Sequence, residues 1–87
     1  MKYYVIEIQR DNDGKENFGM YSYNTKDEAL KVFYQKMSSG ITAGLNGTVS
    51  FVLNKVMNDL GNAIEIGRWV KPEPEPEPVE PEENTEE

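Results

Sequence analysis

The chain has no cysteine and no histidine among its 87 residues. Without cysteine it can form neither a disulfide nor a thiolate metal site, and without histidine it lacks the usual general base near neutral pH and the commonest metal ligand. The acidic residues of the first 71 positions fall mostly in expected turns or in the first turn of an expected helix, where capping accounts for them. We therefore expect no enzymatic activity, no metal site and no bound cofactor.

Proline is absent from the first 71 residues, and all five prolines lie between Pro72 and Pro81. Alternating Pro and Glu in this segment forbid a helix, remove backbone donors and favour an extended polyproline conformation. The segment also holds eight glutamates and no basic residue. The sequence predicts a globular domain over residues 1–71 and a disordered Pro/Glu-rich tail over residues 72–87.

The net charge of −7 belongs to this tail, because the first 71 residues carry nine basic and eight acidic side chains. A nearly neutral body with an acidic tail lacks the basic stripe that neutralises phosphates, so direct nucleic-acid binding is not expected. The tail is interpreted as solubilising, with phosphate mimicry in a basic groove of another protein as the alternative. No apolar run approaches the length of a membrane span, and no signal-peptide pattern follows Met1, so a cytoplasmic protein without membrane contact is expected.

One segment has the pattern of an amphipathic helix. Thr25 and Glu28 form a capping box, in which the threonine oxygen accepts from a first-turn amide and the glutamate reaches back to the cap amide. Apolar residues follow at three- and four-residue spacing, namely Ala29, Leu30, Phe33 and Met37. Gly40 or Gly44 can take the left-handed conformation that ends a helix. The helix is therefore expected over residues 25–40, with a flexible crossover over residues 41–47.

Four other segments alternate in the manner of strands: residues 2–10, 17–23, 48–57 and 63–70. Turn residues separate the first two and the last two, and the second turn, residues 58–62, is expected to end on a glycine with positive φ. The first turn has the oxygen-rich D-x-D-G spacing of a calcium loop, but the rest of an EF-hand is missing, so a hairpin turn is favoured. The predicted fold is α+β: a two-layer ββαββ domain with a four-stranded antiparallel sheet and one helix on one face.

The alternation also predicts which sheet face meets the helix. The residues expected in the core with Leu30, Phe33 and Met37 are Tyr4, Ile6, Ile8, Met20, Val49, Phe51, Leu53, Ile64 and Ile66. The uncovered face is then expected to present Tyr3, Val5, Tyr21, Tyr23, Val52 and Trp69, and these residues without Val52, together with Arg68, form the predicted interaction surface. The alternative to a protein interface is stacking of nucleic-acid bases on this surface, which is disfavoured because basic residues do not interleave with the aromatics. A core of this size also favours a homodimer or higher oligomer.

Several stretches resemble small proteins encoded by phages and prophages of Gram-positive bacteria. They are residues 2–9 (KYYVIEIQ), 27–29 (DEA), 33–37 (FYQKM), 56–62 (VMNDLGN) and the acidic proline-rich end. The resemblance covers nearly the whole chain as a general pattern and carries over no functional residue. It implies a mobile-element origin and a location in the cytoplasm of a bacterial host or in a virion.

From these features we expect a non-enzymatic phage-type protein that binds a host macromolecule or ligand, as an inhibitor or sequestering agent against host defence. The alternative is a minor structural or assembly protein of a phage particle. A third hypothesis is a small-molecule sponge in which Arg10, Arg68, Tyr3 and Trp69 supply charge and stacking.

Overall fold

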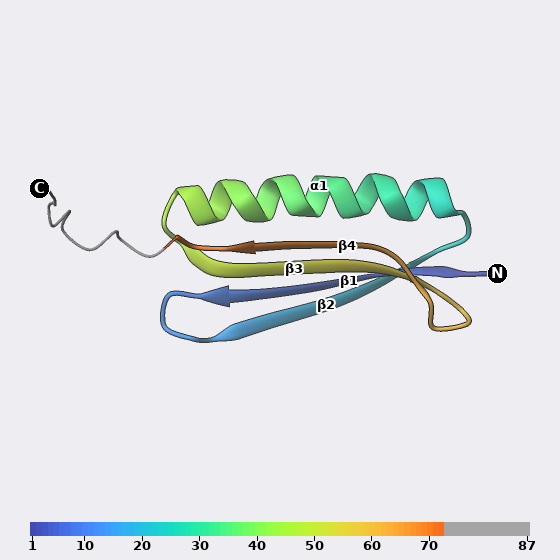
Figure 1. Ribbon diagram of the computed structural model, residues 1–87, viewed down its shortest axis with the longest axis horizontal. Coiled ribbons are helices and arrows are strands. Elements are labelled where there is room, and N and C mark those ends of the chain that lie inside the picture. Colours follow the sequence, from blue (N-terminus) through green and yellow to red (C-terminus); the bar gives the residue numbers. More distant parts are fainter. Residues whose placement is uncertain (73–87) are drawn as a thin grey trace, which may run out of the picture.

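The computed structural model describes residues 1–72, so most of the predicted tail, residues 73–87, lies outside the described part. Four strands form one antiparallel sheet and one helix lies along one of its faces, which confirms the predicted α+β ββαββ fold (Figure 1). The elements are β1 (Tyr3–Asp11), β2 (Glu16–Tyr23), α1 (Lys26–Leu45), β3 (Val49–Asn58) and β4 (Ala63–Val70). The strand order is β2-β1-β3-β4, so the two hairpins join through antiparallel pairing of β1 with β3.

Both hairpin turns are built on an Asx side chain that binds its own backbone. In the first turn, Asp11 Oδ1 accepts the N–H groups of Asp13 and Lys15, each at 2.9 Å. In the second, Asn58 Oδ1 accepts from the amides of Leu60 and Asn62, each at 3.0 Å. The glycine of the second turn has φ +82, as the sequence predicted. The Asp11 carboxylate thus completes a turn, which agrees with the hairpin interpretation of this segment.

The start of α1 confirms the predicted cap, and its end does not match the prediction. Thr25 Oγ1 accepts the Glu28 N–H at 3.2 Å, and the Thr25 hydroxyl also lies 3.2 Å from Glu28 Oε1, so the glutamate binds the hydroxyl in place of the cap amide. The helix then continues to Leu45, and the residue in the left-handed conformation is Gly47, with φ +87. The predicted end at residue 40 and the flexible crossover over residues 41–47 are therefore wrong.

The helix does not end at Gly40 or Gly44 because both face the sheet at close range. Both glycines are buried. A Cβ added to Gly40 would lie 2.7 Å from a Val52 methyl group, and one added to Gly44 would overlap the ring of Trp69. The absence of side chains at these positions lets the C-terminal half of α1 lie directly on β3 and β4.

The core consequently forms on the face opposite to the one predicted. Val5 and Val56 are fully buried with Ala29 and Phe33, and Val52 is fully buried beneath the helix. Val49 and Ile64 do contribute, Val49 as a buried residue and Ile64 by packing on this cluster, as predicted. The other seven sheet residues expected in the core lie on the far side by strand alternation: Tyr4, Ile6, Ile8, Met20, Phe51, Leu53 and Ile66. The physical reason is the close approach of α1, under which Val52 lies at Gly40 and the Trp69 ring fits because Gly44 has no side chain.

Candidate functional site

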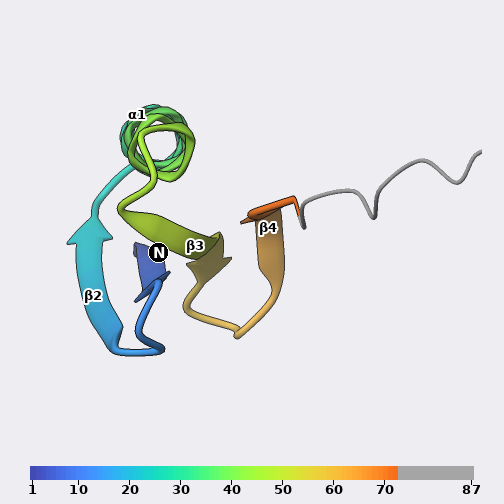
Figure 2. The same cartoon turned by 90° about the vertical axis from the view of Figure 1, so that its left-hand side faces the viewer.

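The sheet face opposite α1 is covered by no other element of residues 1–72 (Figure 2). We call it the open face, and its residues are Tyr4, Ile6, Ile8, Arg10, Glu16, Phe18, Met20, Ser22, Phe51, Leu53, Lys55, Met57, Ile66, Arg68 and Val70. Phe18 is 67% exposed, Met20 60% and Ile66 57%. Four strands of about eight residues give the face a footprint of about 500 Å². This footprint includes the polar and charged side chains of the face, so the apolar patch is smaller and falls in the size range of the largest patch on a typical soluble monomer, which is often a binding site.

The register makes the apolar side chains of this face continuous across three strands. Ile8 lies between Phe18 on β2 and Leu53 on β3, and Ile6 lies between Met20 and Lys55. The apolar side chains therefore form a band from β2 across β1 to β3, and the cations of the face lie between these side chains.

Most of the predicted interaction surface lies on the helix side. Val5 is fully buried, Trp69 lies against the helix at Gly44, and Tyr3 and Tyr23 pack on the core. Tyr21 lies on the same side, 38% exposed, under the Lys36 ammonium group. The predicted placement on the uncovered face is therefore wrong for these five residues, because the strand phase is shifted by one. Arg68 is exposed on the open face, as expected.

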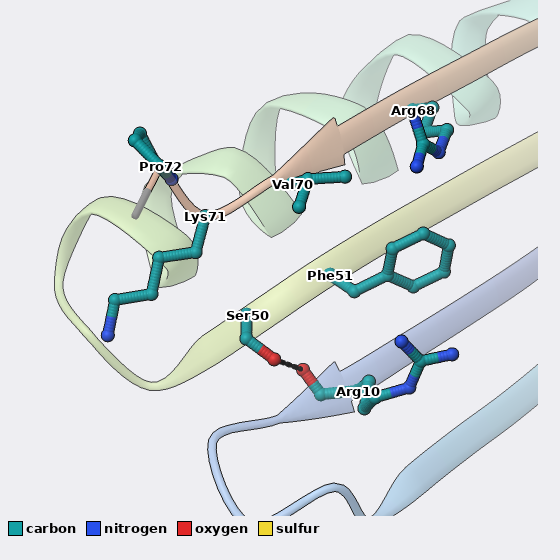
Figure 3. Close-up of a pocket in the computed structure, with 7 residues that line it drawn as sticks. All are labelled: Arg10, Ser50, Phe51, Arg68, Val70, Lys71 and Pro72. Atoms are coloured by element: carbon teal, nitrogen blue, oxygen red, sulfur yellow. Dashed lines mark hydrogen bonds between the residues drawn. The ribbon is translucent and has the colours of Figure 1, made fainter. Parts of the chain in front are cut away.

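The open face has a basic pocket at the end where β1 stops and β4 leaves the sheet (Figure 3). This pocket has a volume of about 480 Å³ and is lined by Arg10, Ser50, Phe51, Arg68, Val70, Lys71 and Pro72. The Phe51 ring is its floor, with the Arg10 guanidinium carbon 4.6 Å and the Arg68 guanidinium carbon 5.8 Å from the ring centroid. Guanidinium groups over an aromatic ring are held by cation–π attraction while their N–H groups stay free to bind anions.

The three cations of this pocket differ in their partners. Arg10 donates from Nε at 3.2 Å and from Nη2 at 2.9 Å to Glu16 Oε2, a salt bridge between two exposed side chains. Within residues 1–72, Arg68 and Lys71 form no salt bridge. No carboxylate lines the pocket within this part of the chain, so its surface is suited to an anionic group attached to an apolar one.

The opposite end of the open face has an acidic group, Asp59, held by two neighbours. Asp59 accepts the Lys2 backbone N–H at 2.7 Å and the Tyr4 hydroxyl at 2.8 Å. The Lys2 amide first, and then the Tyr4 hydroxyl, hold the pKa of Asp59 below its ordinary value. The same hydrogen bond raises the pKa of Tyr4. Beside this pair, Tyr4, Ile6, Met20 and Met57 line a shallow apolar hollow of about 380 Å³, so the face carries opposite charges at its two ends.

On the helix side, a polar hollow lies between α1 and the β1–β2 pair. Lys36 Nζ lies 3.4 Å from Glu7 Oε1 and 4.3 Å from the centroid of the Tyr21 ring. Burial lowers the pKa of Lys36, but the charge of Glu7 and its hydrogen bond outweigh this effect, and the net shift is upward. The Tyr21 hydroxyl completes the group at 3.5 Å from Glu7 Oε1. These groups satisfy one another and fasten the helix to the sheet.

One buried polar side chain was not anticipated from the sequence. Asn54, on the helix side of β3, is fully buried and donates from Nδ2 to Met37 Sδ at 3.0 Å, while its Oδ1 has no partner among the described residues. Glu7 lies opposite Asn54 on β1, but no hydrogen bond joins the two side chains.

The described part of the chain contains no group of three or more acidic side chains placed to hold a metal ion. A search of the same residues finds no helix that meets the length and hydropathy needed to cross a bilayer. Comparison of the chain with protein families, curated proteins and solved structures finds no match.

Proposed function

We propose that this protein is a non-enzymatic binding protein whose open face takes up a partner protein. The observation that carries the proposal is the continuous apolar band on an uncovered sheet, with Phe18 and Met20 each more than half exposed. Burial of such side chains stabilises an association by roughly 25 cal/mol for each Å² of apolar surface removed from water.

The charges of the open face define the chemistry of the partner. Arg10, Lys55 and Arg68 rise from the face, and Lys71 flanks it. A partner that presents apolar side chains bordered by carboxylates would satisfy both features, and aspartate or glutamate would pair with Arg68 and Lys71.

A second copy of the chain fits this surface less well. In a two-fold dimer formed face to face, like residues lie near one another around the axis, and Lys55 lies near the middle of β3. Two lysines brought together there would repel each other, and Glu16 of the same face is already paired with Arg10. The homodimer predicted from the small core is therefore the alternative occupant of this surface.

In this proposal the protein acts as predicted from the phage resemblance, by occupying a host protein and so blocking it. No observation on the structure favours the alternative of a particle component over this role.

The test compares two exposed aromatic residues on opposite sides of the molecule. Phe18→Ala removes a ring from the open face, and Tyr34→Ala removes a 58% exposed ring from the outer side of α1. A host protein captured by the wild-type chain is purified and titrated against each variant by calorimetry. We expect Phe18→Ala to weaken binding and Tyr34→Ala to leave it unchanged.

Equal affinity of the two variants would contradict the proposal. Two further measurements test the other possible occupants of the open face. A titration with a mixed single-stranded oligonucleotide tests nucleic acid, and the solution mass of the chain alone tests a second copy. Tight oligonucleotide binding, or a dimer dissociated by Phe18→Ala, would replace the partner protein as the occupant.

A further inference from the structure

The basic pocket lies where the described chain ends, and this coincidence suggests its occupant. After β4, the Lys71 N–H donates to the Ser50 carbonyl at 2.8 Å, and Pro72 forms part of the pocket wall. The chain therefore enters residues 73–87 from the pocket itself (Figure 3).

The segment that follows has the charge that the pocket lacks. Residues 73–87 contain eight glutamates and no basic residue, and the first three alternate with proline as Glu73, Glu75 and Glu77. Arg68 and Lys71 have no salt bridge within residues 1–72, and Arg10 shares one glutamate. Guanidinium–carboxylate pairs are among the stronger polar contacts, and those formed over an apolar floor such as Phe51 are less exposed to water than ordinary surface pairs.

Length does not prevent the segment from reaching the whole basic end. Fifteen residues extended at about 3.1 Å each span about 45 Å, and a nine-residue strand such as β1 spans about 30 Å. Because the segment is joined directly to the pocket, its effective concentration there is in the millimolar range or higher, which favours its own pocket over that of a second copy.

We propose that the acidic segment 73–87 binds in cis to the basic end of the open face, with its glutamates paired to Arg68, Lys71 and Arg10. This contact is driven by charge and needs no regular secondary structure in the segment. This contact extends the proposed function, because a segment bound here competes with an acidic partner for the same cations. Only this competitive role rests on the proposed function. The contact itself can be measured without any partner.

The absence of cysteine makes the test direct. Thr85→Cys introduces a single thiol into the full chain, to which a nitroxide spin label is attached. Paramagnetic broadening of backbone amides is then measured by NMR at low ionic strength. We expect broadening at the amides of Phe51 and Arg68, with the amides of the N-terminal half of α1 unaffected.

Two charge-removing variants of matched size give the control. Arg68→Gln with Lys71→Gln should abolish the broadening, and so should about 0.5 M NaCl, where the screening length falls to about 4 Å. Lys26→Gln with Lys31→Gln removes the same charge from exposed positions of α1 and should leave it intact. All four side chains are exposed, so neither pair disturbs the core.

Broadening spread evenly over the surface, or unchanged by Arg68→Gln with Lys71→Gln, would overturn the proposal. Binding between two copies of the chain is tested with a mixture of spin-labelled chain at natural isotope abundance and ¹⁵N-enriched chain without a spin label. Broadening in that mixture shows binding between copies and overturns binding in cis. None of these outcomes decides whether a partner binds at Phe18, so a failure here is separate from a failure of the proposed function.

Discussion

Replacing Gly44 by alanine tests the close approach of α1 to the sheet. In an exposed helix this change is stabilising by about 1 kcal/mol, because alanine loses less conformational freedom than glycine. Here the new Cβ would overlap two carbons of the Trp69 ring. Overpacking of this kind costs about 1–3 kcal/mol, and we take the upper end because the obstacle is a rigid ring. The expected net result is a loss of about 2 kcal/mol.

The assay is urea denaturation followed by far-UV circular dichroism, with a thermal melt in parallel. For a domain of this size, a loss of about 2 kcal/mol corresponds to a fall in Tm of roughly 8–16 °C. Trp69 is the sole tryptophan of the chain, so its fluorescence reports on the same contact. Gly40→Ala should give a smaller loss, because its Cβ would meet a Val52 methyl group at 2.7 Å and not an aromatic ring.

The same substitution in a Trp69→Leu background isolates the contact. Without the ring, only the helix propensity of alanine remains, so Gly44→Ala should be neutral or stabilising by about 1 kcal/mol. The two changes are then coupled by about 2–3 kcal/mol. A Gly44→Ala variant as stable as the wild type, or one that loses the same amount in both backgrounds, would refute the packing argument.

Three other changes have defined outcomes. Asn54→Leu removes the buried oxygen that has no partner within residues 1–72 and should raise the free energy of unfolding by about 1 kcal/mol in a urea titration. A lower free energy of unfolding would show that the hydrogen bond donated by Asn54 Nδ2 stabilises the fold by more than the unpaired oxygen destabilises it. The pKa of Asp59 is lowered in the folded protein, so its contribution to stability is present above the ordinary pKa of 3.8 and is lost as the pH falls through the folded pKa. Asp59→Asn should therefore have a lower Tm than the wild type at neutral pH. A Tm difference that persists at a pH well below 3.8 would contradict this. Thr25→Ala should cost about 1 kcal/mol and speed amide exchange in the first turn of α1, and unchanged exchange there would count against the cap.

The parts of the fold that depend on neighbouring residues could be predicted from the sequence. The strands alternate, the turns contain Asx and glycine, and Thr25 with Glu28 marks the start of the helix, because each of these signals acts within a few residues. The end of the helix could not be predicted in this way. Gly40 and Gly44 suggest a helix end when considered locally, and their role in the structure depends on Val52 and Trp69, which are distant in sequence.

The candidate site was assigned to the wrong face for a related reason. β1 has apolar residues on both sides, with Val5 on one and Ile6 and Ile8 on the other, so alternation alone does not say which side meets the helix. A partial signal is the spacing of the helix residues: Gly40 and Gly44 continue the stripe of Phe33 and Met37, and the latter two side chains lie over Gly67 of the sheet. Large side chains occur on both sheet faces, with Tyr3 and Trp69 beside the helix, so side-chain size alone does not separate the two faces.

The pairing of β1 with β3 also sets an order of events during folding. Each hairpin can form from neighbouring residues, but Val5 pairs with Val56, so the first strand made meets its second partner only after most of the chain has been synthesised. Until then β1 has one unpaired edge, with the large apolar side chains of the open face beside it. Closing this central pairing brings together residues distant in sequence, and we expect it to limit the rate at which the domain folds.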